Sequence, residues 1–173
     1  PGGKGANQAV AAARLGGKVV FLAKLGQDVF GDEALKGFEI EGIDTAMVVR
    51  DPEAPSGVAL IMVDDQGENC ISVALGANAA MTPADLETVN REMAKFDYLL
   101  IQLEIPIEVV SAAVEMATSA NTKVVLNPAP AQTLSDEILK NVHIITPNQT
   151  EAELLTGVKV ENLASAREAA SIL

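Results

Sequence analysis

A glycine-rich segment near the start of the chain holds the first residues that could bind a ligand. Residues 2–8 read GGKGANQ and precede an alanine-rich run that predicts a helix. Glycines such as Gly2 and Gly3 let backbone amides approach a ligand, and a helix start directs its N–H groups toward it. Lys4 and Asn7 add hydrogen-bonding groups that suit sugar hydroxyls better than a bare phosphate. The spacing matches neither the G-x-x-x-x-G-K-[ST] phosphate loop nor the G-x-G-x-x-G dinucleotide fingerprint, and a plain turn before a helix explains the glycines equally well.

Two further polar segments follow predicted strands. Glu104 comes directly after residues 98–103, and residues 127–131, NPAPA, follow residues 123–126. The carboxyl ends of strands in an open parallel sheet face the ligand crevice, so Glu104 could bind a pair of hydroxyls there. Position alone favours a solvated carboxylate. Two prolines stiffen the second segment, which is either a rigid floor beside a site or a plain connection.

A fourth segment combines an amide and a carboxylate at a predicted helix start. Asn148 is a strong N-cap residue, and Glu151 three positions later completes a capping-box pattern. The functional alternative is that both residues, one turn apart at the end of a strand, organise hydrated Mg²⁺ and phosphate oxygens. Without further information the capping role is the preferred interpretation.

Composition limits the possible partners. The 173-residue chain carries a net charge of −12, which disfavours nucleic acid and anionic membranes as partners. No apolar run is long enough to span a bilayer. Cys70 is the single cysteine, so an internal disulfide framework is excluded and a reducing, cytoplasmic compartment is expected. His143 has no nucleophile or metal-ligand partner at a suggestive spacing and is interpreted as a packed or edge histidine.

Apolar runs and Gly/Pro punctuation predict alternating helices and strands. Helices are predicted at residues 6–15, 31–41, 107–120, 148–155 and 163–173, with a further helix starting after Thr82 and Pro83. Strands are predicted at residues 18–25, 47–50, 57–63, 69–75, 98–103, 123–126 and 142–145. Apolar strands separated by helices indicate an α/β fold with a mostly parallel central sheet covered by helices on both faces.

The region between residues 44 and 75 interrupts this alternation. Its short strands have no helix between them, and the turn sequence DDQG at residues 64–67 predicts a β-hairpin. We therefore expect residues 1–43 and 76–173 to form an incomplete α/β core and residues 44–75 to form a small β-strand lid. The chain begins in a turn without a preceding strand and stops inside a helix, which is typical of a fragment.

Taken together, these motifs resemble those of the ribokinase-like carbohydrate kinase family. The resemblance rests on the run GGKGANQAVAAA at residues 2–13, GANA at residues 76–79, NPAPA at residues 127–131 and TPNQTEAE at residues 146–153. Their order and spacing agree over essentially the whole chain. Four motifs in order are far more specific than any one of them.

The resemblance implies transfer of the ATP γ-phosphate to the 5-hydroxyl of D-ribose, with Mg²⁺ and a monovalent cation such as K⁺ as cofactors. It implies that Gly2, Gly3, Lys4, Asn7 and Glu104 contact the sugar. It also implies that Asn148 and Glu151 organise Mg²⁺ and phosphate, with Glu151 contacting Mg²⁺ indirectly through water.

The hairpin at residues 57–75 resembles the lid that covers the sugar in this family. Ala59, Ile61, Ile71 and Val73 are candidates for its apolar inner side. Such lids often pair, which also hides their strand edges, so a homodimer formed through the lid is expected.

The family's remaining catalytic parts are expected outside the chain. The Asp that clamps the sugar should precede Pro1, and the Gly-Ala-Gly-Asp anion hole with its catalytic Asp should follow Leu173. We therefore expect no kinase activity from these 173 residues alone. Two alternatives stay open: a related sugar or nucleoside kinase of the same family, and a non-catalytic sugar-binding module.

Overall fold

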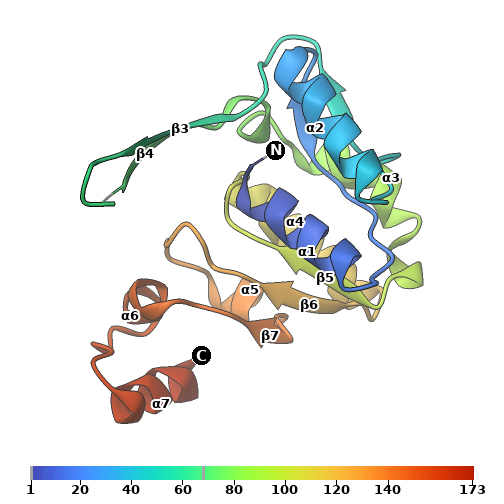
Figure 1. The fold of residues 1–173 in the computed structure, drawn as a ribbon. Helices are drawn as coiled ribbons and strands as arrows, with labels where there is room; N and C mark the ends of the chain where they lie inside the picture. The colour runs from blue at the N-terminus through green and yellow to red at the C-terminus, as the bar shows by residue number, and fades with distance from the viewer. Residues whose placement is uncertain (1, 68) are drawn as a thin grey trace. The chain divides into compact units, whose positions relative to one another are not determined.

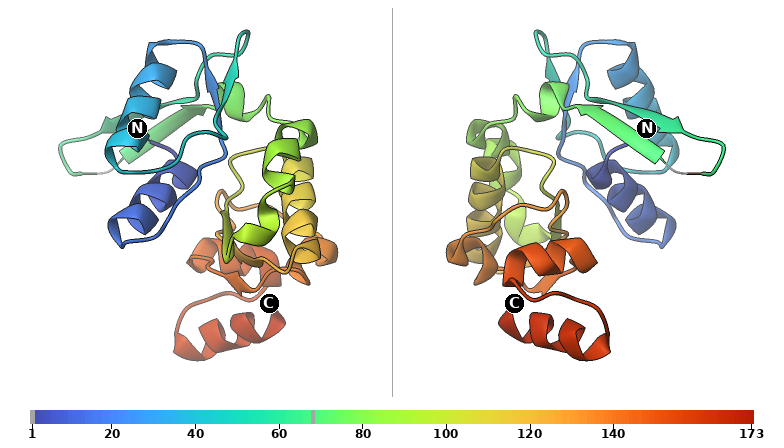
Figure 2. Two further views of the ribbon diagram at one scale, coloured as in Figure 1. Left: turned by 90° about the vertical axis from the view of Figure 1, so that its right-hand side faces the viewer. Right: turned by 90° about the vertical axis from the view of Figure 1, so that its left-hand side faces the viewer.

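The computed structural model describes residues 2–67 and 69–173, with only the backbone described for Asn69 and Ile71. It divides into two compact units, Pro1–Met81 and Thr82–Leu173, called here the first and the second unit. Figures 1 and 2 show the ribbon in colours that run from the N-terminus to the C-terminus. Each unit combines helices with parallel strands, which agrees with the predicted α/β class.

The first unit pairs two parallel strands around a connecting helix. Its elements are α1 (Lys4–Arg14), β1 (Lys24–Gly26), α2 (Val29–Ile40), β2 (Val49–Asp51), β3 (Val58–Val63), β4 (Asn69–Ala74) and the 3-10 turn η1 (Gly76–Asn78). β1 and β2 are parallel, as the α2 crossover between them requires. A buried hydrophobic cluster in this unit consists of Ala6, Ala9, Phe38 and Ile43. The ring centres of Phe21 and Phe38 lie 5.0 Å apart in an edge-on arrangement.

The predicted hairpin is present in the first unit. β3 and β4 pair antiparallel from Val58↔Ala74 to Val63↔Asn69 and form an arm that projects from the rest of the unit (Figure 1). β2 pairs with β1 rather than with the hairpin. The division into a core and a lid of residues 44–75 remains a proposal.

The second unit contains a three-stranded parallel sheet in the order β5-β6-β7. Its elements are η2 (Pro83–Leu86), α3 (Glu87–Asn90), η3 (Met93–Lys95), β5 (Tyr98–Ile101), α4 (Ile107–Ser119), β6 (Lys123–Leu126), α5 (Asp136–Leu139), β7 (Ile144–Ile145), α6 (Gln149–Thr156) and α7 (Leu163–Ile172).

Helix α4 forms the core of the second unit because one of its faces is apolar. Residues at positions 109, 110, 113, 114 and 117 are all buried, a spacing that gathers them on one side of a helix. This helix contacts β5, whose Ile101 is buried, and β6, whose Val124 and Leu126 are buried. Thr122 anchors the start of β6 by donating from Oγ1 to the carbonyls of Met93 and Phe96. The Lys123 ammonium of β6 lies 5.6 Å from the centre of the Tyr98 ring of β5.

The structure corrects the sequence prediction in several places. The strands expected at residues 98–103 and 142–145 are shorter, at Tyr98–Ile101 and Ile144–Ile145. The strand expected at residues 18–25 is limited to Lys24–Gly26 and a single bridge between Val20 and Asp44, because the partner segment turns at residues 45–48. The helix expected after Pro83 is a 3-10 turn followed by one α-helical turn. The short helix α5 was not predicted. Among the described residues, no helix combines the length and apolarity needed to cross a bilayer.

Candidate functional site

The glycine-rich segment forms the start of α1. The helix begins at Lys4, two residues earlier than predicted, so Lys4 and Asn7 lie in its first turns rather than in a loop. Gly3 precedes it with φ 95°, a backbone conformation that glycine adopts without strain. Lys4 and Asn7 are three residues apart, which places them on the same helix face, and both are exposed. The structure therefore presents one cation and one amide together beside the exposed Gly2 and Gly3.

Three polar segments of the second unit meet at the carboxyl edge of its sheet. The segment after each strand is hydrogen-bonded to the neighbouring strand or segment. Leu103 N–H donates to Ala129 O at 2.9 Å, and Asn127 N–H donates to Ile101 O at 2.9 Å. The Asn127 side chain donates to Thr146 O at 3.0 Å. The segments that carry Glu104, Asn127 and Asn148 are therefore neighbours, as a parallel sheet requires.

Part of the proline segment, residues 127–131, is packed inside this edge. Pro128 and Ala129 are buried, and the peptide bond between Ala129 and Pro130 is cis. Glu104 lies on the neighbouring segment and is half-buried. The role of the proline segment as a rigid floor remains a prediction.

Asn148 and Glu151 form the complete capping box at the start of α6. Asn148 Oδ1 accepts from Glu151 N–H at 2.9 Å, while Asn148 N–H and Nδ2 donate to Glu151 Oε2 and Oε1 at 2.8 and 2.9 Å. Glu151 is 5% exposed and Asn148 is exposed. Each carboxylate oxygen accepts one of these bonds, and each can accept a further one from bound water.

The candidate lid residues share one face of the hairpin. Ala59 pairs with Val73 and Ile61 pairs with Ile71, and alternate positions along paired strands point to the same side. Ala59, Ile61 and Val73 are exposed, whereas the side chain of Ile71 lies outside the described part of the chain. The opposite face also carries exposed apolar side chains, Leu60 and Met62.

The candidate residues fall in both units. Gly2, Gly3, Lys4 and Asn7 belong to the first unit together with the hairpin, and Glu104, Asn148 and Glu151 belong to the second. Gly2, Gly3, Lys4 and Asn7 are brought together at the start of α1, and the segments of Glu104 and Asn148 are neighbours at the sheet edge. Their joint role in one site remains a prediction.

Sequence reasoning missed a network of charged residues at the base of the hairpin. Hydrogen bonds from the Ser56 and Gly31 backbone amides hold the pKa of Asp28 below its ordinary value. Those from Ala54 and Glu53 similarly lower the pKa of Asp51. Asp28 could have been recognised as the N-cap of the helix that starts at Val29, but its partner Ser56 is 28 residues away and no local pattern indicates it.

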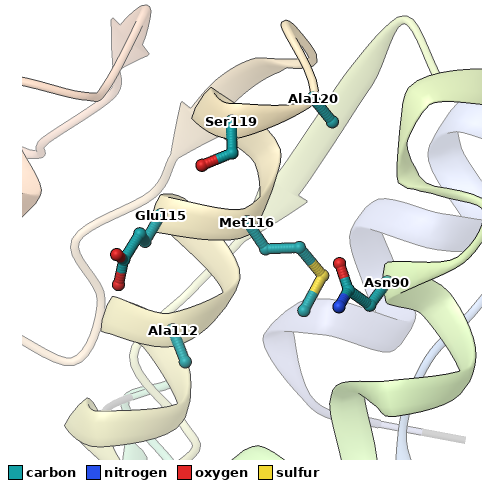
Figure 3. Close-up of a pocket in the computed structure, with 6 residues that line it drawn as sticks. All are labelled: Asn90, Ala112, Glu115, Met116, Ser119 and Ala120. Atoms are coloured by element: carbon teal, nitrogen blue, oxygen red, sulfur yellow. The ribbon is translucent and has the colours of Figure 1, made fainter.

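Other features of the described chain lie apart from these residues. No three His, Cys, Asp or Glu side chains gather in an arrangement that could hold a metal ion within the described residues. A shallow hollow beside α4 is lined by Asn90, Ala112, Glu115, Met116, Ser119 and Ala120 (Figure 3). None of the predicted site residues lines it.

The chain belongs to the pfkB family of carbohydrate kinases, whose profile matches residues 1–173. This confirms the family resemblance that the four motifs indicated.

Particular relatives are kinases of five-carbon sugars. The chain is 48% identical to a ribokinase of Haemophilus influenzae over 99% of its own length and 56% of the relative's. It is 40% identical to a deoxyribokinase of Salmonella typhi, with the same coverage of both chains. Its fold superposes on Arabidopsis thaliana ribokinase, solved in complex with ribose and ATP, with a TM-score of 0.91 at 28% identity over 98% of this chain and 56% of that one. The chain therefore spans about half the length of these relatives.

Proposed function

We propose that the whole protein transfers the γ-phosphate of ATP to the 5-hydroxyl of D-ribose. The observation that carries the proposal is the shared sheet edge, where Glu104, the proline segment and Asn148 follow three neighbouring parallel strands. This is the place where open α/β sheets bind ligands. The sequence similarity to ribokinases supports ribose as the sugar.

In this proposal the sugar is bound by hydroxyl contacts. Lys4 and Asn7 offer donors and an acceptor from one helix face, and the glycines beside them leave the backbone open to a ligand. Glu104 supplies a carboxylate that can accept from two neighbouring hydroxyls. Such contacts orient the 5-hydroxyl, and phosphoryl transfer depends chiefly on positioning and on electrostatic stabilisation.

Asn148 and Glu151 have the chemistry to organise Mg²⁺ and phosphate. Glu151 is buried and already accepts from Asn148, so it suits a contact to Mg²⁺ through water better than direct ligation. Bound Mg²⁺ would neutralise charge on the transferring phosphate. The catalytic Asp, most of the ATP site and the site for a monovalent cation such as K⁺ are expected outside these 173 residues.

The hairpin is proposed to cover the sugar and to join two copies of the protein. Closure of an apolar lid would expel water, which competes with the sugar hydroxyl for the phosphate. Apolar side chains are exposed on both faces of the hairpin, so one face could cover the sugar while the other contacts a second copy of the protein. A second copy would also cover the strand edges of the hairpin. We also infer a cytoplasmic location, in line with the single Cys70.

The deoxyribokinase relative favours 2-deoxy-D-ribose as the competing substrate. The test is a steady-state assay of the whole protein with ATP and Mg²⁺, comparing D-ribose, 2-deoxy-D-ribose and a nucleoside. We expect the highest kcat/KM with D-ribose and a product phosphorylated at the 5-hydroxyl. A preference for either other substrate supports the related-kinase alternative, and binding of ribose without turnover supports the non-catalytic module.

A further inference from the structure

The base of the hairpin is held by one carboxylate. Asp28 caps α2 by accepting from Gly31 N–H at 2.8 Å. The same carboxylate accepts from Ser56 N–H and from Ser56 Oγ, each at 2.7 Å. Ser56 Oγ in turn accepts from Gly26 N–H at 3.0 Å. The Asp28 and Ser56 side chains together therefore join the start of α2 and the end of β1 to the segment that enters β3.

The packing around Ser56 leaves no room for adjustment. Ser56 is 5% exposed, and a Cβ placed on Gly26 would lie 2.7 Å from Ala54 O. A Cβ on Gly31 would lie 3.0 Å from Ser56 Oγ. The backbone at Gly26 and at Gly31 is therefore packed closely against residues 54–56. The Ser56 hydroxyl cannot shift far without moving these backbone segments.

The segment that leaves the hairpin is fixed to the segment that enters it. Ala77 N–H donates to Pro55 O at 2.7 Å, and Ala77 is completely buried. A Cβ on Gly57 would lie 2.7 Å from Leu75 O. We call these two segments, residues 54–57 and 75–78, the root of the hairpin.

Beyond its root, the described part of the hairpin is largely exposed. β3 is exposed along almost its whole length, and it pairs with β4 along all six of its residues. The direction in which the hairpin leaves the first unit is therefore set at the root.

We propose that Asp28, acting through Ser56, is a positioning residue that fixes the orientation of the hairpin and thereby controls sugar binding. The Asp28–Ser56 hydrogen bonds connect α2 to the hairpin, and their effect on the kinetics rests on the proposed function. A loosened root would leave the hairpin less often in the position that covers the sugar, which weakens sugar binding without touching the ATP site.

The test uses Asp28→Asn and Ser56→Ala in the whole protein. Asparagine is as good an N-cap as aspartate, so Asp28→Asn keeps the bond from Gly31 N–H but faces Ser56 N–H with an amide NH₂. We expect the KM for the sugar to rise about fivefold or more while the KM for ATP changes less than about twofold. Asp44→Asn is the matched control, because Asp44 also accepts a backbone N–H, from Ala46, in the same unit.

Hydrogen exchange provides a readout that does not require activity. In Asp28→Asn, amides of residues 54–60 and Ala77 should exchange about tenfold faster, while those of residues 33–40 in α2 keep their protection. Unchanged exchange at the root overturns the inference whatever the activity. Faster exchange with an unchanged sugar KM overturns the link to sugar binding. If Asp28→Asn exchanges faster at the root but the wild-type protein phosphorylates no sugar, the result contradicts the proposed function and not the structural role of Asp28.

Discussion

At the scale of single residues, Asn148 and Glu151 combine a structural and a proposed chemical role. Their capping box accounts for three hydrogen bonds at the start of α6 and fixes the Glu151 carboxylate in a buried position. A group fixed in this way loses little conformational entropy when it binds a hydrated ion. The two interpretations of this motif are therefore compatible, since the cap holds in place the group that the chemistry would use.

Replacement of Asn148 should separate these roles. Asn148→Ala removes the acceptor for Glu151 N–H, so the free energy of unfolding should fall by about 1 kcal/mol, as for other N-cap losses. We also expect kcat of the whole protein to fall at least about tenfold, because the Glu151 carboxylate loses its side-chain donor, Asn148 Nδ2, and keeps only the bond from the backbone N–H of residue 148. Urea denaturation measures the first effect and the kinase assay measures the second.

The second unit offers a matched control in Asn162. It caps α7 by accepting from Ala164 and Ser165, within a capping box of the same type. Asn162→Ala should cost a similar free energy of unfolding and leave kcat unchanged. An equal loss of kcat in both variants would mean that Asn148 acts on stability alone.

At the scale of elements, the root of the hairpin depends on a glycine. Gly76 has φ 52°, and a Cβ there would overlap the carbonyl of Pro55. Any other residue would incur both a left-handed backbone and a steric conflict with the opposite segment.

Gly76→Ala should therefore destabilise the first unit more than an ordinary positive-φ substitution. Gly42 has φ 73° and open space where a Cβ would lie, so Gly42→Ala isolates the backbone cost. We expect Gly76→Ala to lower the free energy of unfolding by at least about 1 kcal/mol more than Gly42→Ala does. Equal effects in thermal or urea unfolding would show that the root adapts to the extra carbon.

The sequence predicted most elements because their signals are local. Two short apolar runs without a helix between them and the DDQG turn indicated the hairpin, and the Asn148 cap indicated α6 within one residue. Local patterns also identified the three segments that meet at the sheet edge, because each of these polar segments follows a short apolar run.

What the sequence could not predict depends on distant partners. The bonds between Asp28 and Ser56 join residues 28 positions apart, and neither residue type is unusual where it stands. Strand 18–25 was predicted too long because its length is set by where the partner segment turns, at Thr45 and Val48, and not by its own apolar content.

At the scale of the whole molecule, the apolar hairpin bears on assembly. Leu60 and Ile61 point to opposite faces of β3 and are 67% and 62% exposed. A monomeric protein seldom leaves both faces of a strand pair apolar, so the pair has the character of an interface.

Charges placed on both faces should therefore dissociate the proposed dimer. We expect the whole protein to sediment as a dimer and the variant Leu60→Asp/Ile61→Asp to sediment as a monomer, because carboxylates would be buried in the interface. Leu15→Asp is the control, since Leu15 is 89% exposed and lies at the end of α1. A monomeric wild type, or a double variant that stays dimeric, would contradict assembly through the hairpin.

The distribution of aromatic residues gives the two units different optical properties. The chain has no Trp and one Tyr. Tyr98 lies in β5, so tyrosine emission originates in the second unit, while the first unit has only the weakly emitting Phe21, Phe30 and Phe38 as aromatic residues. Tyrosine fluorescence therefore follows unfolding of the second unit without interference from the first. A Trp introduced into the first unit would then allow the two transitions to be followed separately in one sample.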